Sequence, residues 1–492
     1  MKEGTSKWMV LFTVMVGTFL GRLDQTIVNL GLPDIIKDFG ITVSSAGWIA
    51  TAYILANAIF VPVWGKLGDT IGRKRVYIWG FSLFIVGSVL AGIAWNLQSM
   101  IVFRIIQAIA GSADYPTAMA ILTVTFAAGK ERAQALGIWS SSFAAASVFG
   151  PLLGGPLIDT FGWRSVFLIN VPVGLIGVFL ALRYVHESVS EKPTQKFDWW
   201  GAITLGISLS ALVLVLDKGL DWGWLSEYAL ACYGIMIMFL AIFIQIERTH
   251  PEPIVDLKFF KNSIFVNASA NNFIVFMGLM GAIFLLPVFA QTFLGYDATQ
   301  TGYLFMPMAF GMLMAAPFGA SLTGKVDPRW VIFVSTIGTA GALYLFSFLD
   351  PKSTALDIMI PLFLMAIMLG GGMAQRTAVI AAAVPEAEIG SASAVLALVR
   401  NIAGAFGIAL FGTLLKNAQE SNVLEIAQNS VIRSTDPTVI AQGISLIELK
   451  AQVAAYAQVY EVAAIVIFFG AFITLFMRAD KSRMAGKEIH VE

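Results

Sequence analysis

The sequence predicts an all-α polytopic membrane protein with two six-helix bundles and two further helices inserted between them. Three observations predict this class: an apolar composition, fourteen apolar runs of membrane-spanning length, and an internal repeat. Of the 492 residues, 58% are hydrophobic and 13% are charged, and the mean hydropathy is +0.79. A soluble chain could not remove so much apolar surface from water, so we expect a lipid bilayer around most of the helices.

Each apolar run is close to the roughly 20 residues that an α-helix needs to cross a bilayer. The runs fall near residues 8–32, 46–64, 76–95, 99–124, 133–158, 163–184, 199–217, 226–246, 264–292, 299–323, 330–349, 357–384, 391–415 and 456–477.

Lysine and arginine are distributed unevenly between the two sets of connections, and this bias predicts the orientation. With the N-terminus in the cytoplasm, twenty of these residues fall in cytoplasmic segments and seven in outer loops. We therefore expect a multi-pass protein of the cell (inner) membrane with both termini in the cytoplasm. The polar connection at about 416–455 then lies outside, as an amphipathic helix or a loose loop.

An internal repeat divides the chain. A charged loop, Gly65–Val76, follows the second run, and a shorter version, Gly324-Lys-Val-Asp-Pro-Arg329, follows the second run of the last six. We expect an N-terminal bundle at 1–185, a linker with the two additional helices at 186–250, and a C-terminal bundle at 251–492. Parallel repeats of this kind place a substrate site between the halves, near the middle of the membrane.

The loop Gly65-Lys-Leu-Gly-Asp-Thr-Ile-Gly-Arg-Lys-Arg-Val76 concentrates charge in a sequence with little elsewhere. Asp69 and Arg73 are four residues apart, where one helical turn would bring carboxylate and guanidinium together. Gly65 and Gly72 permit a tight turn. The pattern resembles the loop between helices 2 and 3 of the major facilitator superfamily, where this pair would hold helix ends together in the outward-facing state. An ordinary basic loop that fixes topology is the alternative.

Four further motifs narrow the resemblance to the fourteen-helix drug:proton antiporter branch of that superfamily, over nearly the whole chain. Ala108 stands where the motif that begins at Arg104 usually has glycine. The resemblance implies proton-driven efflux with broad specificity, by alternating access of two rocking bundles. The motifs are Leu23-Asp-Gln-Thr-Ile-Val-Asn-Leu-Gly-Leu-Pro33, Arg104-Ile-Ile-Gln-Ala-Ile-Ala-Gly111, Gly150-Pro-Leu-Leu-Gly-Gly155 and Phe167-Leu-Ile-Asn-Val-Pro172.

The third motif contains Gly150, Pro151, Gly154 and Gly155 on one helix. The missing side chains let a neighbouring helix approach closely, and the proline bends the helix. We expect this stretch to pack against the opposite half and to seal the cytoplasmic gate in one state. Ordinary small-residue helix packing is the alternative.

Ionisable side chains inside the membrane are costly and therefore point to function. Asp24 and Arg104 lie at comparable depth on antiparallel runs, so we expect them to pair. The resemblance implies that the acidic residue takes part in proton coupling. A carboxyl group that exchanges an arginine partner for a proton can serve this purpose, since the arginine lowers its pKa and burial raises it. A purely structural ion pair is the alternative.

Asp114 and Arg376 depart from the family pattern and occupy equivalent runs at similar depth. We expect them to pair across the central cavity, with Asp114 assisting Asp24 in proton coupling. Two charges that face separate water-filled pockets are the alternative.

The expected lining of the cavity includes Arg22, Gln25 and Asn29, which share a polar stripe of the first run with Thr18 and Thr26. Counting Arg400, four intramembrane arginines face two aspartates, which favours anionic or zwitterionic substrates. For the aromatic candidates, helix packing or lipid contact is the alternative. The remaining expected lining residues are Tyr53, Gln107, Phe143 and Arg376.

Other classes of protein find no support. The sequence has no Walker A motif, no His/Cys/Asp spacing for a metal and no histidine inside the membrane for a Ser-His-Asp hydrolase. Zero net charge gives no case for nucleic acid. We expect a non-enzymatic efflux antiporter that uses the proton gradient, no cofactor and no metal, and that functions as a monomer on a small organic substrate. A dedicated exporter of one organic anion, metabolite or lipid is the alternative, and a non-transporting receptor is a further one.

Overall fold

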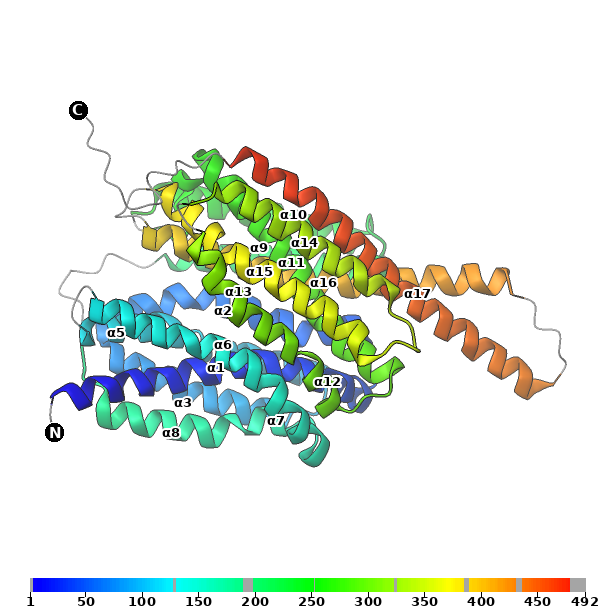
Figure 1. Cartoon of the computed structure of the whole chain (residues 1–492), viewed down its shortest axis with the longest axis horizontal. Coiled ribbons are helices and arrows are strands. Elements are labelled where there is room, and N and C mark those ends of the chain that lie inside the picture. The colour runs from blue at the N-terminus through cyan, green and yellow to red at the C-terminus, as the bar shows by residue number, and fades with distance from the viewer. Residues whose placement is uncertain are drawn as a thin grey trace.

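The computed structural model describes residues 3–126, 130–188, 198–251, 253–322, 325–384, 389–430 and 436–477. These residues form helices joined by short connections and contain no strand. The helices lie side by side along one axis (Figure 1), and the start of α1 and the end of α17 lie at the same end of the molecule. We call this the near end and the opposite one the distal end.

The N-terminal bundle forms one side of the molecule (Figure 1). Its fourth and sixth predicted runs are each broken into two helices, at residues 112–113 and 169. Its elements are α1 (Glu3–Phe39), α2 (Val43–Ile71), α3 (Arg73–Gly92), α4 (Leu97–Gly111), α5 (Asp114–Thr125), α6 (Lys130–Phe161), α7 (Ser165–Leu168) and α8 (Asn170–Tyr184).

The rest of the chain forms the other side. The additional helices α9 and α10 pack on each other, and α9 also contacts α2 and α16 of the two bundles. The elements are α9 (Trp199–Trp222), α10 (Glu227–Thr249), η1 (Leu257–Lys261), α11 (Ser263–Phe293), α12 (Ala298–Leu304), α13 (Met306–Ser321), α14 (Pro328–Leu345), η2 (Phe346–Phe348), α15 (Ala355–Ala382), α16 (Ile389–Gln428), α17 (Pro437–Phe472) and η4 (Ile473–Phe476).

Each predicted run coincides with one helix or with two consecutive helices. Within the described residues, eleven segments are long and apolar enough to cross a membrane. The runs at 99–124, 133–158 and 299–323 are not among these segments, so the full count of fourteen crossings stays a prediction, as do the boundaries at 185 and 250.

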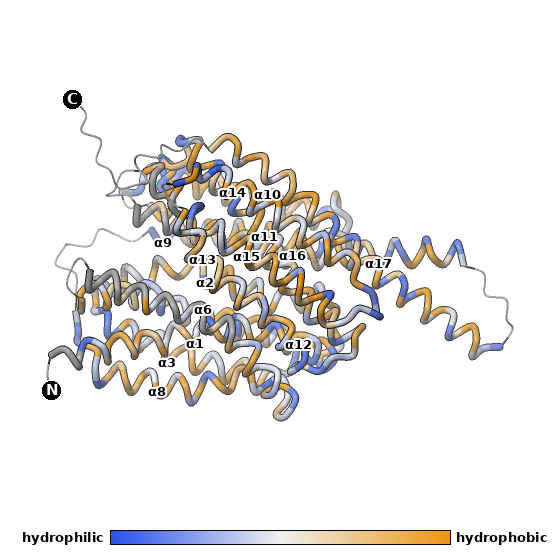
Figure 2. Tube along the Cα trace, in the orientation of Figure 1, coloured by the Kyte–Doolittle hydropathy of each residue, from blue (hydrophilic) through white to orange (hydrophobic). Residues whose placement is uncertain are grey.

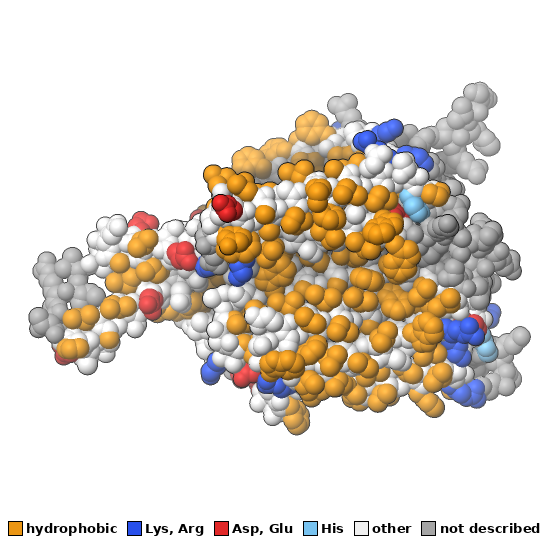
Figure 3. Space-filling view, turned by 180° about the vertical axis from the view of Figure 1, so that it is seen from behind, with side chains coloured by type: hydrophobic (Ala, Val, Ile, Leu, Met, Phe, Trp, Pro, Cys, Tyr) orange, Lys and Arg blue, Asp and Glu red, His pale blue; other side chains and the backbone are white. Residues whose placement is uncertain are grey.

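The outer surface fits a bilayer. Apolar side chains cover much of the face of the bundle that Figure 3 shows, while Lys, Arg, Asp and Glu gather toward its ends and on a projecting hairpin. Along the chain trace, hydrophobic residues follow the helices and hydrophilic ones cluster toward the ends (Figure 2). On α8 the side chains of Leu175, Ile176 and Phe179 are each more than half exposed. In water this surface would be costly, and in lipid it is favourable.

The hairpin is the distal part of α16 and α17 (Figure 1). The helical interpretation of residues 416–455 is confirmed for the described part, because α16 continues to Gln428 and α17 begins at Pro437. Asp436 caps α17 by accepting hydrogen bonds from the side chain and backbone N–H of Thr438, and these bonds lower the pKa of its carboxyl group.

Candidate transport site

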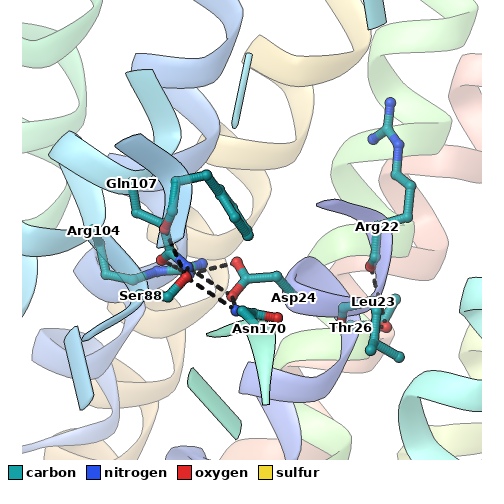
Figure 4. Close-up of polar contacts among 9 residues, drawn as sticks. Arg22, Leu23, Asp24, Thr26, Ser88, Arg104, Gln107 and Asn170 are labelled. Atoms are coloured by element: carbon teal, nitrogen blue, oxygen red, sulfur yellow. Dashed lines mark hydrogen bonds and ion pairs between the residues drawn. The ribbon is translucent and has the colours of Figure 1, made fainter. Parts of the chain in front are cut away.

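A buried polar cluster in the N-terminal bundle surrounds Asp24 (Figure 4). Arg104 Nη1 lies 2.6 Å from Asp24 Oδ2, and the two side chains are 2% and 0% exposed. Gln107 Nε2 donates to Asp24 Oδ1 at 2.9 Å. The pairing that the sequence predicted is therefore present, and it links α1 to α4.

Two members of this cluster were missed by sequence reasoning. Asn170 Nδ2 donates to Asp24 Oδ1 at 2.8 Å. Ser88 Oγ accepts from Gln107 Nε2 at 2.7 Å and from Asn170 Nδ2 at 3.3 Å. Asn170 was visible as an isolated amide in an apolar motif, whereas Ser88 gave no signal. With them the cluster joins four helices: α1, α3, α4 and α8.

The carboxylate of Asp24 thus accepts three hydrogen bonds, one of them from a guanidinium group. Such bonds stabilise the ionised form more than neutral hydrogen bonds do. Arg104 is held from its other side by Tyr53, whose ring centroid lies 4.0 Å from the guanidinium carbon. Tyr53 and Gln107 are 1% and 0% exposed. In this conformation they face Arg104 and Asp24 inside the N-terminal bundle and are not among the residues that line the cavity between the bundles; their predicted contact with substrate stays a prediction.

Arg22 points away from this cluster (Figure 4). Its Nη1 atom donates to Gln25 Oε1 at 2.9 Å, and its charge is attracted by Asp114. Asp114 is also near Thr18, and its Oδ1 atom has no hydrogen-bond partner among the described residues. Residues 22 and 24 face different directions because residues two positions apart in an α-helix differ by about 200° around its axis.

Arg376 in α15 occupies a second buried polar cluster, within the C-terminal bundle. Its Nε donates to Asn271 Oδ1 at 3.0 Å, and its Nη2 donates to Ser335 Oγ at 3.0 Å and Thr336 Oγ1 at 2.9 Å. The predicted Asp114–Arg376 pair is therefore wrong for this conformation. Equal depth does not fix the direction of a side chain around its helix, and α11 and α14 supply the partners of Arg376.

A cavity of about 220 Å³ lies between the two bundles. Thr26, Asn29 and Pro151 line its N-terminal side, and Arg376 lies on its C-terminal side. Asn29 and Arg376, two of the expected lining residues, lie in this lining, and their contact with substrate stays a prediction. The Phe143 side chain lies outside the described residues. Most of the lining is apolar and rich in methionine: Leu30, Phe276, Leu279, Met280, Ile283, Pro287, Phe305, Met308, Ala309, Met312, Leu369 and Met373.

The glycines of α6 close the distal side of this cavity. A methyl group at Gly155 would overlap Thr299 Cα in α12, and one at Gly302 would overlap Pro151 O. Asp159 fastens the same contact, because its carboxylate accepts from Ala298 N at 3.1 Å and Thr299 N at 2.9 Å. In this conformation the motif meets α12 at the distal end, and its predicted role in sealing the cytoplasmic gate stays a prediction.

The charged loop turns at Gly72, whose φ of +117° disfavours other residues. Glu187 holds the start of α3 by accepting from Lys74 N at 3.0 Å and Arg75 N at 3.2 Å. Sequence reasoning missed this cap. The Asp69 side chain lies outside the described residues, so its pairing with Arg73 stays a prediction.

Comparison with known proteins now identifies the family. The Major Facilitator Superfamily profile matches residues 14–408. The chain belongs to this superfamily. Members of this kind are transporters rather than enzymes, and they need no cofactor. The superfamily therefore accounts for the cavity between two bundles as a place for a small molecule that crosses the membrane.

Two relatives illustrate the range of the branch. The multidrug transporter protein MdtP of Bacillus subtilis is 33% identical over 426 residues, which are 86% of this chain and 78% of MdtP. The riboflavin transporter RibZ of Clostridioides difficile is 29% identical over 480 residues, which are 97% of this chain and 99% of RibZ.

Among solved structures, the fold is similar to a bacterial homologue of the human lysosomal transporter Spinster. The TM-score is 0.69, the sequence identity is 17%, and the match covers 96% of this chain and 99% of that one. The superfamily fold of the chain is thus supported by structure as well as by sequence.

Proposed function

We propose that this protein is a proton-coupled antiporter that exports amphipathic organic compounds across the cell membrane by alternating access, with both termini in the cytoplasm and one chain as the working unit. The observation that carries the proposal is the Asp24 cluster, a fully buried carboxylate adjacent to a cavity between the bundles. The names of relatives such as MdtP support drug export.

The same helix, α1, carries Asp24 and part of the cavity lining. Thr26 and Asn29, which line the cavity, follow Asp24 by two and five positions on α1. A shift of α1 caused by a change at Asp24 therefore moves the wall of the cavity. This geometry provides the coupling between a proton and a substrate that antiport requires.

Protonation of Asp24 would remove the charge that balances Arg104. The cluster would lose the attraction between α1 and α4, and Gln107 and Asn170 would donate to a neutral group instead of a carboxylate. Because Asp24 is 0% exposed here, proton exchange belongs to the other conformation of the cycle. In that conformation the distal contact between α6 and α12 is open to the outer side, from which the proton comes.

The test is proton movement in proteoliposomes loaded with acid and challenged with a lipophilic cation and then with an organic anion. We expect one of them to trigger proton movement in the unchanged protein and in Asp38→Asn, and no movement in Asp24→Asn. Asp38 is a matched control because it lies on the same helix in a pair with Arg164 that is about half exposed. Proton movement that survives in Asp24→Asn would contradict the assignment of Asp24.

A dedicated transporter of one organic compound is the second candidate. The full-length similarity to a riboflavin transporter favours it. Competition among chemically unrelated solutes for the same transport distinguishes the two, because a dedicated transporter accepts only close analogues. A non-transporting receptor would bind solute and move none.

A further inference from the structure

The charges of the C-terminal bundle near the cavity are not balanced. Arg376 is 2% exposed, and its three described hydrogen bonds go to the neutral side chains of Asn271, Ser335 and Thr336. Among the described residues it has no carboxylate partner, and the positive charge of Arg400 also acts on it. A buried guanidinium without a counter-ion is costly, and a ligand that supplies one relieves the cost.

Arg400 in α16 is also incompletely satisfied. Its Nε atom lies 3.4 Å from Asn272 Oδ1, which is a weak hydrogen bond. Its Nη2 atom is buried and has no partner within the part of the chain that the structure describes. The guanidinium carbon lies 5.0 Å from the ring centroid of Phe276, and that ring lines the cavity. Arg400 is therefore held beside a ring of the cavity wall, one layer behind the lining itself, with a hydrogen-bond donor to spare.

The two intramembrane aspartates do not supply the missing charge. Asp24 is bound by Arg104, and Asp114 interacts with Arg22. Each aspartate thus matches one arginine of its own bundle, and Arg376 and Arg400 remain as an excess of positive charge on the other side of the cavity.

We propose that Arg376 and Arg400 bind the anionic group of the transported compound, a carboxylate, sulfonate or phosphate. The apolar part of the same molecule then lies among Phe276 and the methionine side chains of the cavity, which adapt to different shapes. Asn271, Ser335 and Thr336 hold Arg376 in position and leave its Nη1 edge for the ligand. The inference rests on the proposed transport function and specifies its substrate class as amphipathic organic anions.

The test is equilibrium binding to the purified full-length protein in detergent, with two probes that share one fluorophore. Dansylglycine carries a carboxylate, and dansylcadaverine carries an ammonium group. The increase in dansyl emission when the probe enters the apolar cavity measures each affinity. Emission that remains in the presence of excess non-fluorescent arylsulfonylglycine comes from probe dissolved in the detergent and is subtracted. We expect the unchanged protein to bind dansylglycine more tightly than dansylcadaverine.

Arg400→Gln is the main variant, since Arg400 is less buried than Arg376. It should weaken dansylglycine binding about tenfold or more, the loss expected when a charge-assisted bond is removed, and should leave dansylcadaverine binding equal or stronger. Arg400→Lys should recover part of the affinity. Arg164→Gln is the control, because Arg164 is an exposed arginine of the distal end, and it should change neither affinity. Arg376→Gln should act like Arg400→Gln, provided that its thermal unfolding shows a folded protein.

Tighter binding of dansylcadaverine, no binding of dansylglycine, or an unchanged affinity in folded Arg400→Gln would overturn the inference. Because the measurement uses no proton gradient, it is independent of the flux experiment on Asp24. Proton-coupled export of a cation with no preference for dansylglycine would leave the proposed function standing and remove the inference. Anion binding without proton flux would do the reverse.

Discussion

Replacing Gly155 by alanine should open the distal end of the transporter. The added methyl group would overlap Thr299 Cα and lie 2.7 Å from Ala298 O. Ordinary contact begins at 3.4 Å, so this carbonyl alone would have to retreat by about 0.7 Å. Both obstacles are backbone atoms, and rotation of a side chain cannot relieve them. Overpacking of this kind costs about 1–3 kcal/mol, which lowers the ratio of distal-closed to distal-open molecules by about 5- to 150-fold.

The assay is the distance between two spin labels that span the contact. The only cysteine, Cys232, is replaced by serine, and labels are attached to cysteines at Phe161 and Tyr303, whose side chains are 75% and 42% exposed. Gly155→Ala should increase the population at long distance. Gly341→Ala is the control, because nothing lies within 4 Å of the added methyl group there. An unchanged distance distribution in Gly155→Ala would refute the idea that this contact closes the distal end.

Three further substitutions test other parts of the structure. Glu247→Gln should raise the unfolding temperature by the equivalent of about 1 kcal/mol. Glu247 and Asp198 are both buried, each has one carboxylate oxygen without a described partner, and the amide of glutamine would supply a donor where two acids now meet. A lower unfolding temperature would show that the two acids do not oppose each other. Asp159→Ala removes the cap that joins α6 to α12 and should lengthen the same spin-label distance less than Gly155→Ala does. A larger effect would show that the cap contributes more to closure of the distal end than the glycine contact does. Glu187→Ala removes the cap at the start of α3 and should lower the unfolding free energy by about 1 kcal/mol, whereas no change in thermal unfolding would mean that the cap contributes nothing to stability.

Hydropathy and charge predicted the fold because the bilayer imposes them directly. An apolar run of about 20 residues has few alternatives to a spanning helix. Breaks within a run were harder to foresee. The break between α4 and α5 falls at Ser112 and Ala113. Gly111 directly precedes it, and Pro116 cannot donate the backbone hydrogen bond that a continuous helix would make to Ser112 O. Pro33 and Pro287 lie inside unbroken helices, however, so a proline alone does not place a break.

Depth along the helices predicted the Asp24–Arg104 pair correctly and the Asp114–Arg376 pair wrongly. Both predictions compared positions along a helix, which the sequence supplies. Only in the first do the two side chains also point toward each other. That rotation depends on which helices are neighbours, and the contact of α15 with α11 and α14 was not visible in the sequence. Asn170 was missed for the same reason, since an amide reveals its role only when its partner is known.

Coupling of proton movement to transport by Asp24 is distinct from a purely structural role in which the residue only holds α1 to α4. The most direct test compares two modes of Asp24→Asn in proteoliposomes: uphill movement of the transported compound driven by a pH gradient, and exchange of labelled for unlabelled compound with no gradient. An amide keeps much of the hydrogen bonding of the cluster but cannot release a proton. If Asp24 carries the proton, exchange continues in Asp24→Asn while uphill movement disappears. Loss of both modes would show that Asp24 has a structural role, and persistence of uphill movement would show that the proton is carried elsewhere.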